Sequence, residues 1–140
     1  MDYKRIRLSE GIKFHGHLGP YLVLGILAGE WAVKRLNCKR YFDVRVKVWG
    51  ANKKPKSCLI DGLQLSTGAT YGKGNIVKLN SHQVKIDFLN LRTNKKITLK
   101  FSNELIGKLK ITKTHSESET LARKLYKTDC SQLFNLTFNP

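Results

Sequence analysis

Two histidines separated by a single glycine are the first residues in the chain whose types and spacing suggest chemistry. His15 and His17 flank Gly16, and Pro20 follows shortly afterwards. In an extended segment, residues two apart point to the same side, so both imidazoles could bind a metal ion or an anion, or transfer a proton. Pro20 suits the first turn of a helix, whose free N–H groups would attract an anion. The alternative is a pair of surface histidines that precede a helix.

A short predicted helix from Cys58 to about Leu65 carries a second set of reactive groups. Cys58, Asp61 and Gln64 share one half of its helical wheel. A thiol at a helix N-terminus has a lowered pKa and favours the thiolate, which can ligate a metal or attack a substrate. The alternative for Cys58 is a small buried residue of the core.

Residues 67–75 form a third segment of interest, rich in glycine and threonine. Glycines let successive N–H groups turn toward one point and form an anion-binding nest, to which Lys73 would add positive charge. The segment is neither a P-loop nor a dinucleotide-binding fingerprint, because the GxxxxGK[ST] spacing is absent and a strand follows. The alternative is a long connecting loop, although loops of this length and composition are more often functional.

Hydrophobic periodicity predicts two helices before the first strand. Residues 3–12 are expected to form a short basic helix that ends at Gly11, and residues 21–36 a largely buried helix. Gly25 and Gly29 leave one face of the second helix smooth enough for another backbone to approach closely.

Alternation of apolar and polar residues predicts four strands. The first covers residues 41–49, and three more follow in meander order at residues 76–79, 84–91 and 97–101. A last helix is predicted from Ser116, with Glu119 in capping-box spacing, to about Lys127. This order predicts an α+β fold in which an antiparallel sheet carries helices mainly on one face, as a single core domain over residues 1–140.

Size and charge limit the classes of function. The 140 residues suit one domain. There are 26 basic and 10 acidic residues, and the net charge of +16 attracts nucleic acid and other anions. Each half of the chain carries 13 basic and 5 acidic residues, which argues against a nucleic-acid-binding tail. A lysine-rich surface on a cytoplasmic protein is the simpler interpretation.

The cysteines and the apolar segments indicate a reducing, non-membrane environment. The three cysteines are widely spaced and form no CxxC pair, so a disulfide framework is not expected. The first residues lack the apolar core of a secretory signal. Residues 18–36 are the most apolar stretch, but Glu30 and Lys34 interrupt it and leave it too short to span a bilayer. We therefore expect a cytoplasmic protein.

Taken in order, these segments resemble the E-subunit family of formylmethanofuran dehydrogenase. Residues 14–20 have the sequence FHGHLGP, a buried helix with Gly25 and Gly29-Glu30 follows, and the third part is CLIDGLQLSTGATYGKGN at residues 58–75. The resemblance implies an α+β core domain, commonly a homodimer, whose cavity is lined by the HGH segment and the cysteine-bearing helix and often holds metal. It also implies an association with one-carbon metabolism, although the oxidation of formylmethanofuran belongs to the other subunits of that enzyme.

Two positions depart from the pattern of this family. Gly19 stands where members typically carry cysteine, and Tyr21 stands where a glycine usually follows the proline. A site that normally offers two thiols would therefore offer one, so a metal would need a further ligand or water. We expect the core domain without the C-terminal zinc finger that many relatives carry.

The residues and the resemblance together predict one pocket that binds a small anionic molecule, a metal ion or both. The predicted catalytic residues are His15, His17 and Cys58. The predicted ligands for zinc or another divalent metal are His17 and Cys58. The predicted substrate-binding residues are Asp61, Gln64, Thr67, Thr70, Lys73 and Asn75. No nucleotide, pterin or flavin motif is found.

The first hypothesis is therefore a small-molecule or metal-binding domain, and the sequence does not decide whether it is an enzyme. Two other hypotheses compete with it. One is a non-catalytic accessory subunit that binds a partner protein through the Gly25 and Gly29 face or through the edge of the sheet. The other is a nucleic-acid-binding protein, which is suggested only by the charge of +16. It lacks a recognisable helix-turn-helix, zinc finger or aromatic RNA-binding motif.

Overall fold

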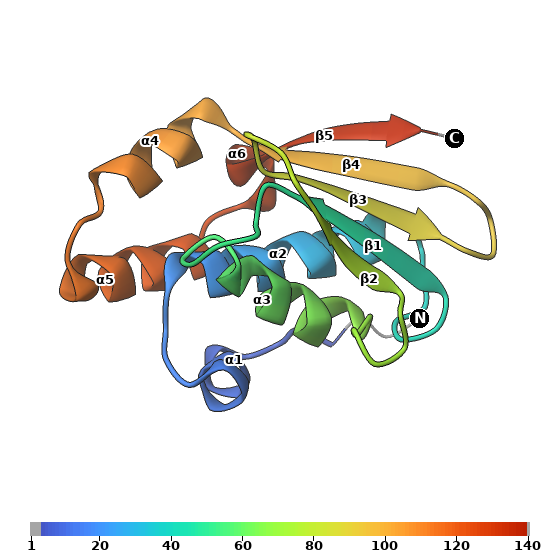
Figure 1. Ribbon diagram of the computed structural model, residues 1–140, viewed down its shortest axis with the longest axis horizontal. Coiled ribbons are helices and arrows are strands. Elements are labelled where there is room, and N and C mark those ends of the chain that lie inside the picture. The colour runs from blue at the N-terminus through green and yellow to red at the C-terminus, as the bar shows by residue number, and fades with distance from the viewer. Residues whose placement is uncertain (1–3, 140) are drawn as a thin grey trace.

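Six helices and five strands lie within residues 4–139, which the computed structural model describes (Figure 1). In chain order they are α1 (Leu8–His15), α2 (Pro20–Arg35), β1 (Val44–Trp49), α3 (Cys58–Thr67), β2 (Ile76–Leu79), β3 (Lys85–Asn90), β4 (Lys96–Phe101), α4 (Asn103–Ile111), α5 (His115–Tyr126), α6 (Cys130–Leu133) and β5 (Phe134–Asn139). The expected α+β fold is confirmed. The four predicted strands are present as β1 to β4, and three of the predicted helices as α2, α3 and α5. The structure adds α4, α6 and β5.

The five strands form one sheet in the order β2-β1-β3-β4-β5. The pairs β1–β3, β3–β4 and β4–β5 are antiparallel, whereas β2 lies at the edge and runs parallel to β1. The prediction that the last three strands follow one another as a meander was therefore wrong for β2. Helix α3 connects β1 to β2, and a helical crossover of this kind is what joins parallel neighbours.

Alternate residues of the strands build one side of the core. Val44, Val46 and Val48 are buried in β1, while Arg45 and Lys47 between them are exposed. The buried face contributes to one continuous hydrophobic core with residues of α2 and α3. The helices therefore cover mainly one face of the sheet, as expected. The first predicted strand begins only at Val44, after a residue with left-handed backbone (Tyr41, φ +78°).

Helices α2 and α3 pack closely because glycines face each other. A Cβ atom placed on Gly25 would overlap the carbonyl oxygen of Leu59, and one placed on Gly62 would overlap the backbone of α2. At Gly29 the neighbouring side chain is Ser66, whose hydroxyl donates a hydrogen bond of 3.0 Å to the carbonyl of Gly25. The predicted close approach of another backbone is confirmed. Because α3 covers this face, it is not available to a partner protein, and the edge of the sheet is the surface that the second hypothesis retains.

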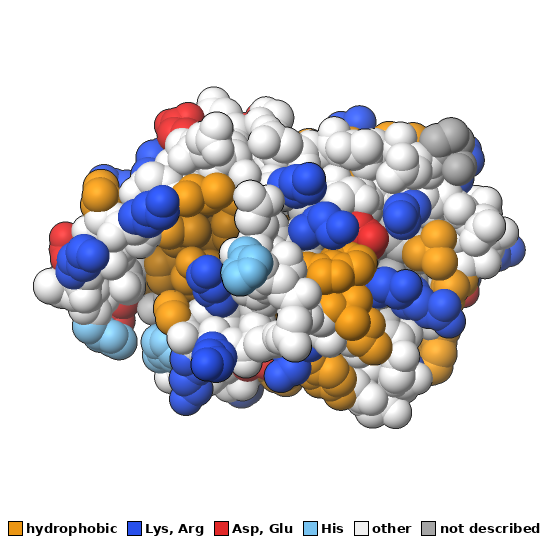
Figure 2. All heavy atoms as spheres, turned by 45° about the horizontal axis from the view of Figure 1, so that its top comes forward, with side chains coloured by type: hydrophobic (Ala, Val, Ile, Leu, Met, Phe, Trp, Pro, Cys, Tyr) orange, Lys and Arg blue, Asp and Glu red, His pale blue; other side chains and the backbone are white. Residues whose placement is uncertain are grey.

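Basic side chains are spread over the molecule instead of forming one block. On the face drawn in Figure 2, lysine and arginine side chains lie over most elements, with few acidic neighbours. Within residues 4–139, no helix has both the length and the apolar character needed to cross a bilayer.

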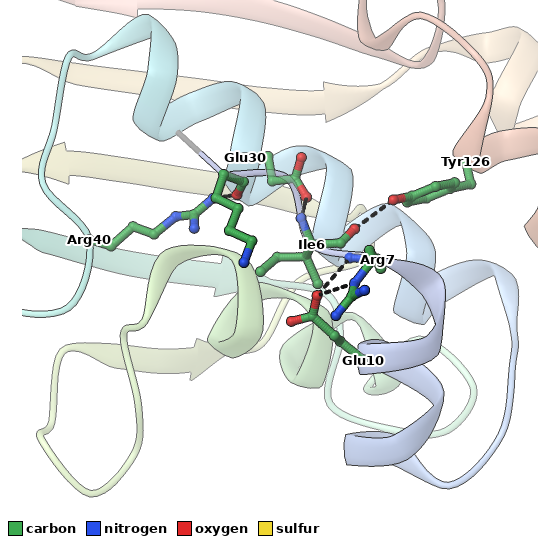
Figure 3. A network of polar contacts seen from close by, with 7 residues as sticks. Ile6, Arg7, Glu10, Glu30, Arg40 and Tyr126 are labelled. Carbon is green, nitrogen blue, oxygen red and sulfur yellow. Dashed lines mark hydrogen bonds and ion pairs between the residues drawn. The ribbon is translucent and has the colours of Figure 1, made fainter. Parts of the chain in front are cut away.

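A network of hydrogen bonds fixes the segment that leads into α1 (Figure 3). Glu30 of α2 accepts a hydrogen bond of 2.8 Å from the N–H of Ile6, and the hydroxyl of Tyr126 in α5 donates one of 2.6 Å to the carbonyl of Ile6. Arg5 donates a bond of 2.6 Å to the carbonyl of Tyr126. Because α1 begins two residues after Ile6, these contacts set the position of the helix that ends at His15.

Candidate functional site

His15 is the last residue of α1 and not part of an extended segment, which corrects the first expectation. Gly11 does not end the helix as predicted, and α1 continues past it to His15. The missing side chain at Gly11 instead makes room for Ile26 and Leu22 of α2. The helix ends at Gly16, whose φ of 105° is a left-handed conformation that glycine adopts without strain.

A hydrogen bond joins His15 to the cysteine-bearing helix. The Nδ1 atom of His15 lies 2.6 Å from Oδ2 of Asp61. The side chain of His15 is only 11% exposed, whereas that of Asp61 is 37% exposed. The other ring nitrogen of His15, Nε2, is buried and has no hydrogen-bond partner within residues 4–139. The predicted contact between the HGH segment and α3 therefore exists, and it runs through Asp61.

His15, His17 and Cys58 line one small hollow of about 100 Å³, which we call the histidine pocket. The ring centroids of His15 and His17 are 4.8 Å apart, and His17 also stacks on His115 at 6.1 Å. His115 and Ser118 complete the wall from the start of α5, and residues 18–21 and Pro55 form the rest. Segments from α1, α3 and α5, far apart in the sequence, thus meet at one point.

Sequence reasoning did not find His115 and Ser118. Their helix begins one residue earlier than expected, and its cap is Thr114, which forms a capping box with Glu117. This cap fixes His115 at the first helical position, beside His17. A single histidine at the start of a surface helix carries no spacing signal, so only the packing of α5 against α2 brings it to the pocket.

The thiol of Cys58 is less acidic than its place at the start of α3 suggested. Burial raises its pKa above the ordinary value for cysteine, and the charge of Asp61 raises it further, while Lys54 acts in the opposite direction. The expected shift toward the thiolate is therefore wrong. In addition, Ser57 makes no side-chain cap at this helix end.

The glycine-rich loop does not contribute to this pocket. Its polar side chains bond to the loop itself and to the adjacent backbone. Lys73 Nζ donates a bond of 2.6 Å to the carbonyl of Gly68, and Asn75 Nδ2 donates to the carbonyls of Tyr41 and Val44 at 2.7 and 3.1 Å. None of the six predicted substrate-binding residues lines the histidine pocket. These six residues are Asp61, Gln64, Thr67, Thr70, Lys73 and Asn75.

The residues of the histidine pocket do not form a complete metal site. Zinc takes four ligands, of which at least three usually come from the protein. No group of three or more histidine, cysteine, aspartate or glutamate side chains within residues 4–139 is arranged to hold a metal ion. His17 and Cys58 share the pocket, but alone they supply two donors.

Gly19 also lines this pocket. It is the position at which the family resemblance predicted a cysteine. Its backbone is extended, with φ of −146° and ψ of 164°, which any residue can adopt. A Cβ atom built on Gly19 would lie 3.6 Å from Nε2 of His17, an ordinary contact distance. A Cβ atom can therefore be added at Gly19 without a clash.

The architecture and the pocket define an α+β domain in which a histidine-bearing helix end faces a cysteine-bearing helix. The model of the family described as "FmdE, Molybdenum formylmethanofuran dehydrogenase operon" matches residues 14–136. The chain belongs to the FmdE family, and the predicted resemblance is confirmed.

Two known proteins illustrate this relationship. The crystal structure of an FmdE-like protein of the tungsten formylmethanofuran dehydrogenase type, from Syntrophus aciditrophicus, superimposes with a TM-score of 0.67 over 94% of this chain and 70% of that one, at 21% identity. A probable S-adenosyl-L-methionine-binding protein from Archaeoglobus fulgidus is 31% identical over 71 residues, which is 49% of this chain. The match spans only 19% of that relative's length.

Proposed function

We propose that this domain binds a small molecule in the histidine pocket, and that His15 accepts a hydrogen bond or a proton from it. The observation that supports the proposal is Nε2 of His15, buried and without a partner within residues 4–139. Unpartnered buried polar atoms are rare in native proteins, and each costs about 1–3 kcal/mol. A bound molecule with a donor group would remove that cost.

In this proposal Asp61 holds the imidazole of His15 in the required form. Its carboxylate accepts a hydrogen bond of 2.6 Å from Nδ1–H. In that tautomer the lone pair of the ring is on Nε2. The carboxylate would also stabilise the positive charge that forms when the ring takes up a proton. Asp61 is thus a positioning residue, and His15 is the group that contacts the ligand.

His17 would control access to His15. Solvent does not reach Nε2 of His15, so a neighbouring side chain has to turn before a ligand atom makes contact. His17 is exposed, and its ring centroid lies 4.8 Å from that of His15. An exposed side chain changes rotamer on the picosecond to nanosecond timescale, so the barrier to turning His17 away from His15 is low.

Ring nitrogen resonances of the full chain, labelled with ¹⁵N-histidine, test this proposal. The probes are formamide and inorganic phosphate, which are small enough for a hollow of about 100 Å³ and carry N–H or O–H donors. We expect at least one probe to shift the His15 Nε2 resonance. His15→Gln should abolish its binding. The proposal fails if His15 responds to none of them, in the wild type or in His17→Ala.

A weakly held metal ion is the second candidate, because His17 and Cys58 line the same pocket. Water or a ligand would have to supply the other coordination positions. Elemental analysis of protein purified without chelator, compared with His17→Ala and Cys58→Ala, tests this candidate. Equal metal content in all three proteins would contradict it.

The assembly is proposed from the family resemblance alone. We propose that the chain forms a homodimer in the cytoplasm and associates with a partner subunit, with nucleic acid as the less favoured partner. Light scattering on purified protein tests the dimer, and pull-down from native extract tests the partner. A monomer that captures nothing would contradict both.

A further inference from the structure

A second and larger hollow lies where the end of β4 meets α4. Its volume is about 640 Å³, within the range of about 300–1,000 Å³ typical of small-molecule sites. Apolar side chains of Val84, Phe101, Ile106 and Leu109 form part of its lining. Figure 2 shows a hollow in which apolar side chains lie among basic side chains and beside a histidine.

Three lysines surround this hollow, which we therefore call the lysine cleft. Lys56, Lys100 and Lys110 line it together with His82, and no acidic side chain of residues 4–139 does. All three lysines are exposed. None of them has an ion-pair partner among the described acidic residues, whereas Lys108 on the same helix pairs with Glu104 at 3.5 Å. The cleft therefore carries three lysine charges with no carboxylate of residues 4–139 in its lining.

The sheet gives a second, independent indication of positive potential at this point. Lys100 lies directly opposite Lys85 in the β3–β4 pairing. Like charges at opposed positions destabilise a sheet. Lys85 lies over the ring of Trp49, 4.2 Å from its centroid, and no ion pair with a carboxylate of residues 4–139 is found for it. An anion beside Lys100 would relieve this repulsion.

We infer that the lysine cleft binds a small amphipathic anion, with an apolar or aromatic body and a carboxylate, sulfonate or phosphate group. The apolar lining would hold the body, and the three lysines would bind the charged group. A second copy of this chain fits poorly in this cleft, because three lysines line it and the copy also carries a net charge of +16. The homodimer proposed above would form through another surface. The inference does not depend on the histidine pocket, although Tyr21 lines both hollows.

Two dyes with the same apolar body provide the test. Anilinonaphthalene sulfonate carries the anionic group, and N-phenylnaphthylamine is the same body without it. Fluorescence titration of the full chain should give clear binding of the sulfonate and at least tenfold weaker binding of the neutral dye. Lys100→Gln/Lys110→Gln should weaken sulfonate binding about tenfold, because two of the three charges proposed to bind the sulfonate are lost. Ile106→Glu should abolish it.

Matched controls separate this cleft from the general positive charge and from the other pocket. Lys108→Gln removes a charge from the same helix but outside the cleft, and should change sulfonate binding less than twofold. His15→Gln should also leave it unchanged, so a failure of the histidine-pocket proposal would be seen separately. Lys100→Gln should not lower the thermal unfolding temperature, because it removes a like-charge pair.

Three outcomes would overturn the inference. The first is equal binding of both dyes, and the second is equal sulfonate binding by Lys108→Gln and by the double variant. The third combines two observations: the sulfonate does not bind to the wild type, and analytical ultracentrifugation shows a wild-type dimer that Ile106→Glu dissociates. That result would make the cleft an interface between copies of the chain.

Discussion

The glycine-rich loop and the histidine pocket differ in how their polar groups are satisfied. In the loop, Lys73 and Asn75 donate to backbone carbonyls, and Asn75 Oδ1 accepts from the N–H of Thr70 at 2.9 Å. In the pocket, His15 bonds to Asp61 through one nitrogen and leaves the other buried and unpartnered within residues 4–139. From the sequence, the polar residues of both regions were predicted to bind a ligand. Their partners suggest that the loop residues hold the backbone, while His15 is available to a ligand.

The largest expected effect is the loss of stability when the loop loses its central side chain. Asn75→Ala removes hydrogen bonds to Thr70, Tyr41 and Val44, and should lower the free energy of unfolding by about 3 kcal/mol at about 1 kcal/mol each. Urea denaturation measures the change.

The control for that experiment is Asn103→Ala. Asn103 is exposed on α4, and no side-chain hydrogen bond is found for it within residues 4–139. Its replacement should change stability by less than about 0.5 kcal/mol. If Asn75→Ala kept its stability but lost binding of a pocket ligand, the loop would be a binding element after all, as predicted from the sequence.

A gain of zinc binding on the pocket side is the second largest effect expected. Gly19→Cys adds a thiol whose Cβ would lie 3.6 Å from Nε2 of His17, giving three protein donors with Cys58. We expect zinc affinity to rise about a hundredfold, or about 2.7 kcal/mol. Competition against a fluorescent chelator measures it.

Gly107→Cys provides the matched control, because Gly107 lies on exposed α4 with open space around its Cβ position. It adds a thiol away from the pocket and should leave zinc affinity unchanged. The gain should also disappear in Gly19→Cys/Cys58→Ala. A gain that survives the loss of Cys58 would mean that His17 and Cys58 do not face a common ion.

Local pattern was sufficient to predict most of the fold. Val44, Val46 and Val48 alternate with basic residues, so β1 could be recognised from the sequence, and Gly25 and Gly29 correctly indicated close helix packing. The position of β2 could not be predicted in this way. It depends on α3 returning the chain beside β1, which is a tertiary effect.

The candidate site was predicted only in part, for a similar reason. The family resemblance predicted that His15, His17 and Cys58 lie close together. The contact between His15 and Asp61, and the burial of Nε2 of His15, are visible only in the folded structure. His115 reaches the pocket because α5 packs on α2. A histidine at a helix start does not reveal which distant segment it contacts.

The hydrogen bond between His15 and Asp61 should contribute more to stability than an exposed ion pair. His15→Gln, Asp61→Asn and the double variant form a thermodynamic cycle. We expect a coupling energy of about 1.5 kcal/mol for this partly buried, charge-assisted bond of 2.6 Å. Urea denaturation at neutral pH measures each variant.

The exposed pair Lys108–Glu104, with atoms 3.5 Å apart, gives the reference for this cycle. Its coupling energy should be about 0.3–0.5 kcal/mol. Equal coupling in the two cycles would remove the reason for treating Asp61 as the residue that positions His15.

The smallest effect concerns the rate at which Cys58 reacts with iodoacetamide. Only the thiolate reacts, and burial together with the charge of Asp61 raises the pKa of Cys58 above its usual value. At pH 8 the thiolate fraction is therefore smaller than that of free glutathione, so Cys58 should react more slowly. The rate should rise with pH, with a midpoint above that of glutathione.

Two comparisons sharpen this measurement on Cys58. Asp61→Asn removes a charge that disfavours the thiolate and should increase the rate at pH 8. Cys130, whose pKa burial raises to about 11, is the internal control and should remain almost unreactive at that pH. A Cys58 that reacts faster than glutathione at pH 8 would instead restore the activated thiolate expected from its place at the start of α3. The cysteine would then rank with His15 as a reactive group of the pocket.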